Sequence, residues 1–151
     1  MKTIGKNKTL AIISWIFAAI VAVIIFHFSS ETAEESAALS ESLLSAIIEF
    51  IGKYIPHALV RKTAHFCEFA ALGFFVSSGF RFSFGKRYIF LPLICCALYA
   101  TSDEIHQIFV DGRAFVFFDI FIDACGSLTG ILVLTLLVFI IEKKMNRKKE
   151  A

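Results

Sequence analysis

The chain of 151 residues is 58% hydrophobic, contains 18 Phe and only 2 Pro, and has a formal net charge of +2. Its mean hydropathy of +0.77 argues against an ordinary soluble domain, which carries more charged and fewer apolar side chains. The basic residues gather before the first and after the last apolar run, as anchors beside lipid head groups do, so we expect membrane lipids and no nucleic acid as partners.

Four segments have the length and apolar character of membrane-spanning helices, which need about 20 residues. They are residues 9–28, 63–80, 88–109 and 118–141. The first follows several lysines, as a signal peptide would, but its apolar run is too long and no cleavage site follows it. We therefore predict an all-α, polytopic membrane protein with four transmembrane helices, the first of which is retained.

The segment between the first two spans has the pattern of an amphipathic helix. Thr32 and Glu35 have the spacing of a capping box, and Leu and Ile then recur at helical intervals among Ser and Glu. The pattern predicts a helix over residues 33–54 that lies on the outer membrane surface. A fifth span is disfavoured because its glutamates would be stranded in lipid.

The distribution of charge predicts the orientation. Both termini are basic, and so is the connection from Arg81 to Arg87, whereas the segment from Glu31 to Lys62 is rich in Glu. Basic loops stay in the cytoplasm. We therefore expect a multi-pass protein of the cell membrane with both termini in the cytoplasm, which an even number of spans permits.

Ionisable and polar side chains recur at the outer ends of the predicted spans. His65 and Glu68 share one face of the second span, and Asp119 and Asp123 share one face of the fourth. Because a charge that faces lipid costs several kcal/mol, we predict one polar cleft at the outer mouth of the bundle. The predicted ligand-binding residues are Lys62, His65, Glu68, Asp103, Glu104, Gln107, Arg113, Asp119 and Asp123.

The alternative is a structural network that only holds the helices together. Acidic groups outnumber basic ones in the predicted cleft, and this excess favours a cation or a cationic ligand. Asp111, Gly112 and Arg113 are typical of a turn at the rim of the cleft, where Asp111 and His106 need no function.

Two further patterns predict helix packing. Cys67, Cys95, Cys96 and Cys125 lie within apolar segments without zinc-site spacing, so we interpret them as packing residues. Gly126 and Gly130 form a G-x-x-x-G pattern that lets another helix approach closely. We assign it to packing inside the bundle, with self-association as the lesser option.

Several blocks of the sequence together resemble the VanZ-like family of small bacterial membrane proteins. They are FSS at Phe28–Ser30, K-x-x-H-F-x-E-F-x-x-L-G from Lys62 to Gly73, D-E-x-x-Q-x-F from Asp103 to Phe109, Gly112-Arg113, and Asp119 with Gly126 and Gly130. The family usually has Asn where this chain has Asp123, and Pro where it has Asp111. The resemblance implies a single domain over residues 1–151 and a role at the cell envelope in teicoplanin resistance, but no mechanism.

Two functions are consistent with the predicted cleft. In the first, the cleft binds an envelope lipid, a lipid-linked wall precursor or a lipid-tailed glycopeptide antibiotic, and Lys62 and Arg113 contact its phosphate or carboxylate. In the second, the protein is an enzyme that modifies such a lipid. Its candidate catalytic residues are His65, Glu68, Glu104 and Asp119. Together with Asp123 they hold a divalent cation, or alternatively His65 acts as general base. Transport is disfavoured because few polar residues continue to the inner side.

Overall fold

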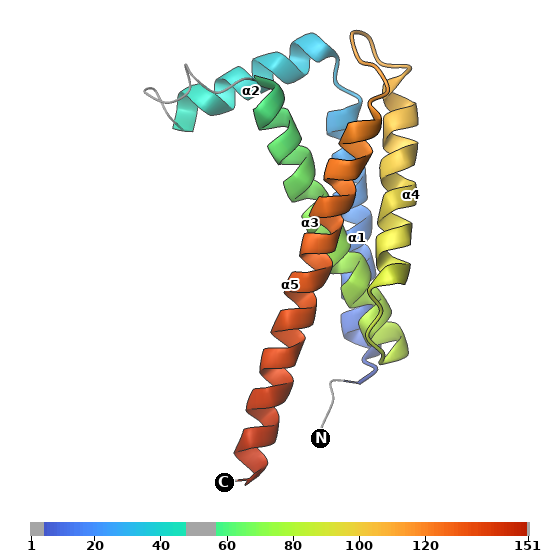
Figure 1. Ribbon diagram of the computed structural model, residues 1–151, viewed down its shortest axis with the longest axis vertical. Helices are drawn as coiled ribbons and strands as arrows, with labels where there is room; N and C mark the ends of the chain where they lie inside the picture. Colours follow the sequence, from blue (N-terminus) through green and yellow to red (C-terminus); the bar gives the residue numbers. More distant parts are fainter. Residues whose placement is uncertain (1–4, 48–56, 151) are drawn as a thin grey trace.

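The computed structural model describes residues 5–47 and 57–150, and within these ranges all of its regular structure is helical. The helices are α1 (Lys8–Ser29), α2 (Ala33–Ile47), α3 (His57–Phe84), α4 (Phe90–Gln107) and α5 (Phe117–Glu150). Figure 1 shows α1, α3, α4 and α5 running along the long axis, with α2 lying across one end. The predicted all-α fold is confirmed.

The two ends of the bundle differ. At the end crossed by α2, which we call the α2 end, the turn after α1 meets the linker between α4 and α5, where Ala33 N–H donates to the Asp111 carbonyl at 3.2 Å. At the opposite end α1 begins, α3 turns into α4, and α5 finishes (Figure 1). We call it the basic end, after Lys6, Lys8, Lys86, Arg87, Lys143 and Lys144.

Two of the described helices are long and apolar enough to cross a membrane by length and hydropathy. They are α1 and the 117–148 part of α5. Helices α3 and α4 do not meet the same criterion. Helix α3 contains Arg61, Lys62, Glu68 and Arg81, and α4 ends in Asp103, Glu104, His106 and Gln107. Length and hydropathy therefore identify two spans among the described helices, where the sequence pattern predicted four.

Helix α2 begins as the capping box predicted. Thr32 N–H donates to Glu35 Oε2 at 2.9 Å, and Glu35 N–H donates to Thr32 Oγ1 at 3.3 Å. The hydrogen bonds from the backbone and the hydroxyl of Thr32 lower the pKa of the Glu35 carboxyl. The helix is described to Ile47, and the rest of the predicted 33–54 helix lies outside the described residues.

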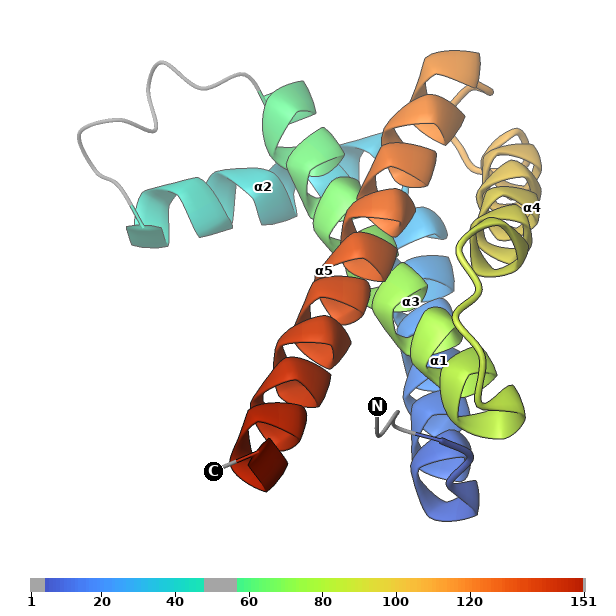
Figure 2. The same cartoon turned by 60° about the horizontal axis from the view of Figure 1, so that its bottom comes forward.

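Helices α3 and α5 make the most extensive contact in the bundle and cross each other closely (Figure 2). A Cβ added at Gly126 would lie 2.4 Å from the Phe66 carbonyl oxygen, and one at Gly130 would lie 1.9 Å from that of Ala70. Only hydrogen fits at these two positions. The prediction that the G-x-x-x-G pattern packs inside the bundle is confirmed.

A hydrophobic core lies between α1, α3 and α4, around Ile25, Phe69, Leu72, Cys96 and Ala100. All four cysteines are free. Cys96 packs in this core as predicted. Cys67 and Cys95 are exposed on the outside of the helices, so the prediction that every cysteine is a packing residue is wrong. Apolar periodicity does not reveal which side of an all-apolar helix faces its neighbours.

An ion triad near the basic end was not predicted. Arg81 Nη2 donates to Glu142 Oε1 at 2.6 Å, and Arg87 donates to Oε2 of the same carboxylate. Arg81 and Glu142 are only 6% and 2% exposed. The sequence pattern placed Arg81 in a connection, whereas α3 continues to Phe84. The extra helical turn buries Arg81 against α5, so the triad ties α3, the connection and α5 together.

Candidate functional site

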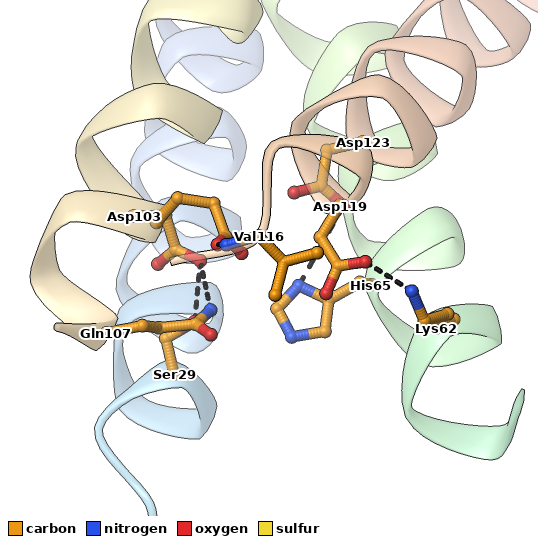
Figure 3. Close-up of polar contacts among 9 residues, drawn as sticks. Ser29, Lys62, His65, Asp103, Gln107, Val116, Asp119 and Asp123 are labelled. Atoms are coloured by element: carbon orange, nitrogen blue, oxygen red, sulfur yellow. Dashed lines mark hydrogen bonds and ion pairs between the residues drawn. The ribbon is translucent and has the colours of Figure 1, made fainter. Parts of the chain in front are cut away.

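The polar residues predicted to form one cleft lie at the α2 end, but they make separate contacts. Figure 3 shows Ser29, Asp103 and Gln107 grouped on one side and Lys62, His65, Asp119 and Asp123 on the other. The first group joins α1 to α4, and the second joins α3 to α5. Helical spacing predicts which residues share a face of one helix, but not which neighbouring helix that face meets.

The contact between α1 and α4 is a buried hydrogen-bond network. Ser29 Oγ donates to Asp103 Oδ2 at 2.7 Å, and Gln107 Nε2 donates to the same oxygen at 3.1 Å. Asp103 is 3% exposed, so it is not a loop charge in water. Nearby, the His106 ring lies 4.6 Å from the Phe26 ring and bonds to Ser30 Oγ. These contacts fix the end of α4 against α1.

Glu104 fixes the linker that leads into α5. Its Oε2 accepts the Val116 N–H at 2.8 Å, and the side chain is almost fully buried. A backbone N–H held by a carboxylate is a strong hydrogen bond. The prediction that Glu104 binds a ligand or acts in catalysis stays a prediction, since the contact seen is with the protein's own backbone.

The contact between α3 and α5 contains two pairs of ionisable groups. Lys62 pairs with Asp119, and its ammonium group lies 5.2 Å from the centre of the Phe118 ring. His65 Nδ1 lies 3.9 Å from Asp123 Oδ1. Asp123 is fully buried, and neither of its oxygens has a hydrogen-bond partner among the described residues. A carboxyl group in this state is costly, and the His65 ring is the one basic group that the structure places beside it among the described residues.

A pocket of about 250 Å³ lies between the end of α1, α2 and the first turns of α3. Its lining residues are Phe28, Glu31, Ser36, Leu39, Val60, Arg61, Ala64, His65, Glu68 and Arg113. Only three of the nine predicted binding residues are among them, namely His65, Glu68 and Arg113. The other six lie in the contacts between helices described above or beside a smaller hollow.

Sequence reasoning missed two charged residues of this pocket, Arg61 and Glu31. The sequence could have indicated Arg61, because it stands four positions before His65 and seven before Glu68 and so shares their helix face. No sequence pattern indicated Glu31, since it lies in the turn that follows α1. Its place in the pocket depends on how that turn is packed.

Arg113 reaches the pocket from the linker before α5. Gly112 has a φ of +74°, a left-handed conformation that glycine adopts without strain, and it turns the chain as predicted. Arg113 Nη2 donates to the Phe28 carbonyl at 3.2 Å, while Nε and Nη1 are buried without a hydrogen-bond partner among the described residues. Burial lowers the pKa of Arg113, and the nearby Arg61 charge lowers it further.

A second hollow of about 10 Å³ is lined by Arg61, Lys62, His65, Asp119, Ile122 and Asp123. This is close to the space that one water molecule needs. His65 lines both this hollow and the larger pocket. Within residues 5–47 and 57–150, no three His, Cys, Asp or Glu side chains are grouped to hold a metal ion.

The site as a whole combines a pocket with apolar and charged walls, and behind it a His65–Asp123 pair. The pocket suits a ligand that has both apolar and charged parts, and His65 faces it. A family model described as VanZ/LLP1 matches residues 14–139. No curated protein and no solved structure matches the chain.

Proposed function

The protein belongs to the VanZ/LLP1 family, and we propose that it is a multi-pass protein of the bacterial cell membrane whose pocket at the α2 end binds the head group of a membrane amphiphile. In this proposal α1, α3, α4 and α5 all cross the membrane. The basic end and both termini lie in the cytoplasm, and α2 lies on the outer surface.

The arrangement of the helices supports this placement. Helix α4 has 18 residues, which at about 1.5 Å per residue nearly match a hydrocarbon core about 30 Å thick. The charged residues of α3 are Arg61, Lys62, Glu68 and Arg81, and the stretch from Phe69 to Phe80 carries no charge. Large apolar side chains are exposed along α1 and α5, among them Ile12, Val23, Leu136 and Phe139. Such surfaces are stable in lipid and costly in water.

The pocket is the observation that carries the proposal. Its apolar wall consists of Phe28, Leu39, Val60 and Ala64. Its polar wall consists of charged side chains from α3, from the turn after α1 and from the linker before α5. Apolar walls with a few convergent polar groups are typical of small-molecule sites. At the outer end of the bundle, such a site lies at the depth where a lipid's tail meets its head group.

A role in glycopeptide resistance, which the family resemblance implies, is consistent with this placement. Lipid-linked wall precursors and lipid-tailed glycopeptides both present a polar group at the outer face and an apolar tail in the membrane. A protein that binds either of them there would change how much antibiotic reaches its target. We therefore include both among the amphiphiles to be tested.

The direct test is lipid binding by the purified protein in nanodiscs, measured by displacement of a fluorescent phospholipid. Ala64→Trp fills the pocket, and Ala19→Trp is its matched control, because Ala19 is an exposed alanine that lines a separate groove of about 280 Å³. We expect saturable binding that weakens about tenfold or more in Ala64→Trp alone. No saturable binding of a phospholipid, a wall precursor or teicoplanin by the wild type would overturn the proposal.

The orientation is tested separately in intact cells, with all four native cysteines replaced. Cysteine introduced at Asp111 should react with a membrane-impermeant maleimide added outside. Cysteine introduced at Lys86 should react only after lysis. The reverse pattern would place the pocket on the cytoplasmic side.

A second candidate, an enzyme acting on the bound lipid, is favoured by one observation. His65 lines the pocket, and its Nδ1 faces the buried Asp123 carboxyl, an arrangement that suits a general base. Asp123→Asn would then abolish turnover of a bound phospholipid and leave its binding intact. If mass spectrometry detects no product after a phospholipid is incubated with the wild type, an enzymatic function on that lipid is excluded.

A further inference from the structure

Four charged side chains of the pocket have no ion-pair partner within the part of the chain that the structure describes. They are Glu31, Arg61, Glu68 and Arg113, two acids and two bases that line the same space of about 250 Å³. By contrast, Lys62 is paired with Asp119, and Arg81 is paired with Glu142. The pocket therefore holds charges of both signs that no protein group neutralises by direct contact.

The two arginines form an anion-binding side. Arg113 uses one N–H on the Phe28 carbonyl and keeps Nε and Nη1 without a hydrogen-bond partner among the described residues. Burial lowers the pKa of Arg113 most, and the Arg61 charge lowers it further, so the two like charges lie close enough to repel each other. Phosphate between two guanidinium groups would relieve that repulsion, and guanidinium forks match phosphate oxygens well.

The two glutamates form a cation-binding side. Neither the Glu31 nor the Glu68 carboxylate accepts a hydrogen bond from a described residue, and both face the pocket. An ionised carboxylate has only acceptors to offer, whereas a primary ammonium group has three donors. A ligand with a primary amine would therefore satisfy these oxygens, and a quaternary amine without N–H donors would not.

We propose that the pocket selects a zwitterionic head group in which a phosphate and a primary ammonium group are a few atoms apart, as in phosphatidylethanolamine. This inference rests on the proposed function and narrows its ligand. The four side chains carry no net formal charge, so a purely anionic head group would meet the two arginines and be repelled by the two glutamates. A zwitterion places each charge opposite its complement.

The test compares phospholipids that have identical acyl chains in the same nanodisc displacement assay. The probes are phosphatidylethanolamine, phosphatidylcholine, phosphatidylglycerol and phosphatidic acid. We expect the wild type to bind phosphatidylethanolamine about tenfold more tightly than the other three. Equal binding of all four, or binding of none, would overturn this inference. Only a failure to bind a wall precursor and teicoplanin as well would overturn the proposed function itself.

Substitutions assign the preference to the two sides of the pocket. Glu68→Gln should abolish the preference for phosphatidylethanolamine over phosphatidylglycerol, and Arg61→Gln should weaken the binding of both. Glu34→Gln is the matched control, because Glu34 is an exposed acid of α2 outside the pocket. A preference that survives in Glu68→Gln, or is lost equally in Glu34→Gln, would contradict the inference.

Free O-phosphoethanolamine separates a lipid ligand from a soluble one with the same chemistry. If it displaces the lipid probe at concentrations similar to those of phosphatidylethanolamine, the ligand is a soluble zwitterion and the apolar wall contributes little. If it does not, the acyl chains contribute to binding and the site belongs to a membrane lipid. The second result is the one we expect.

Discussion

Each end of α3 carries a buried or half-buried arginine, but only one of the two has an ion-pair partner among the described residues. At the basic end, Arg81 is 6% exposed and bonds to Glu142 at 2.6 Å. At the α2 end, Arg61 lines the pocket and makes no ion pair with any residue that the structure describes. A charge with a partner in the protein holds helices together, whereas a charge that faces a pocket without one is available to a ligand. Within one helix, Arg81 therefore has a structural environment, whereas Arg61 is free to contact the proposed ligand.

The largest effect is expected where the paired end is broken. Glu142→Gln removes the charge that the Arg81 and Arg87 guanidinium groups both contact. Breaking a buried ion pair from one side costs about 3–5 kcal/mol. We expect a decrease of this size in the free energy of unfolding, measured by equilibrium denaturation in mixed micelles.

The double variant Arg81→Met/Glu142→Met is the control for this experiment. It removes both buried charges together, so it should recover most of the lost stability. If Glu142→Gln unfolds at the same denaturant concentration as the wild type, the triad has no structural role, and the contrast between Arg81 and Arg61 is wrong.

A smaller loss of stability is expected at the close contact between α3 and α5, which lies between the two ends of the bundle. Gly130→Ala would place a Cβ 1.9 Å from the Ala70 carbonyl oxygen, and α3 and α5 would have to separate. Overpacking of this kind costs about 1–3 kcal/mol. Gly5→Ala is the control, since nothing lies within 4 Å of that position. A Gly130→Ala variant as stable as Gly5→Ala would show that the helices are less closely packed than described.

The smallest effect on stability is expected in the pocket. Arg61→Gln and Glu68→Gln should each change the free energy of unfolding by less than about 0.5 kcal/mol, because neither side chain loses an ion pair. Lipid binding should nevertheless change in both variants. A loss of stability comparable to that of Glu142→Gln would make the pocket charges structural, which is the alternative that the sequence left open.

Features with a local cause were predictable from the sequence. The capping box of Thr32 and Glu35, the Gly112 turn and the close approach at Gly126 and Gly130 all follow from local spacing. Their physical causes lie within a few residues along the chain, or in the absence of a side chain. The same local logic placed His65 and Glu68 on one helix face.

Contacts between polar side chains of different helices were not predictable in the same way. The sequence suggested one cluster of carboxylates, whereas Asp103 bonds to Ser29 and Asp119 pairs with Lys62. The triad around Glu142 was missed because its three members are separated by up to 61 positions. Which face of one helix meets which face of another depends on crossing angles and side-chain packing, which the apolar pattern alone does not specify.

The sequence by itself determined that this protein is helical, strongly apolar and polar at the ends of its helices, because composition and period act locally. Only the tertiary structure decided which of those polar groups bond to a neighbouring helix and which face a pocket. The physical reason is that an ion pair depends on the distance between side chains, and the packing of the bundle sets that distance. Arg61 and Arg81, on one helix, have opposite environments for this reason.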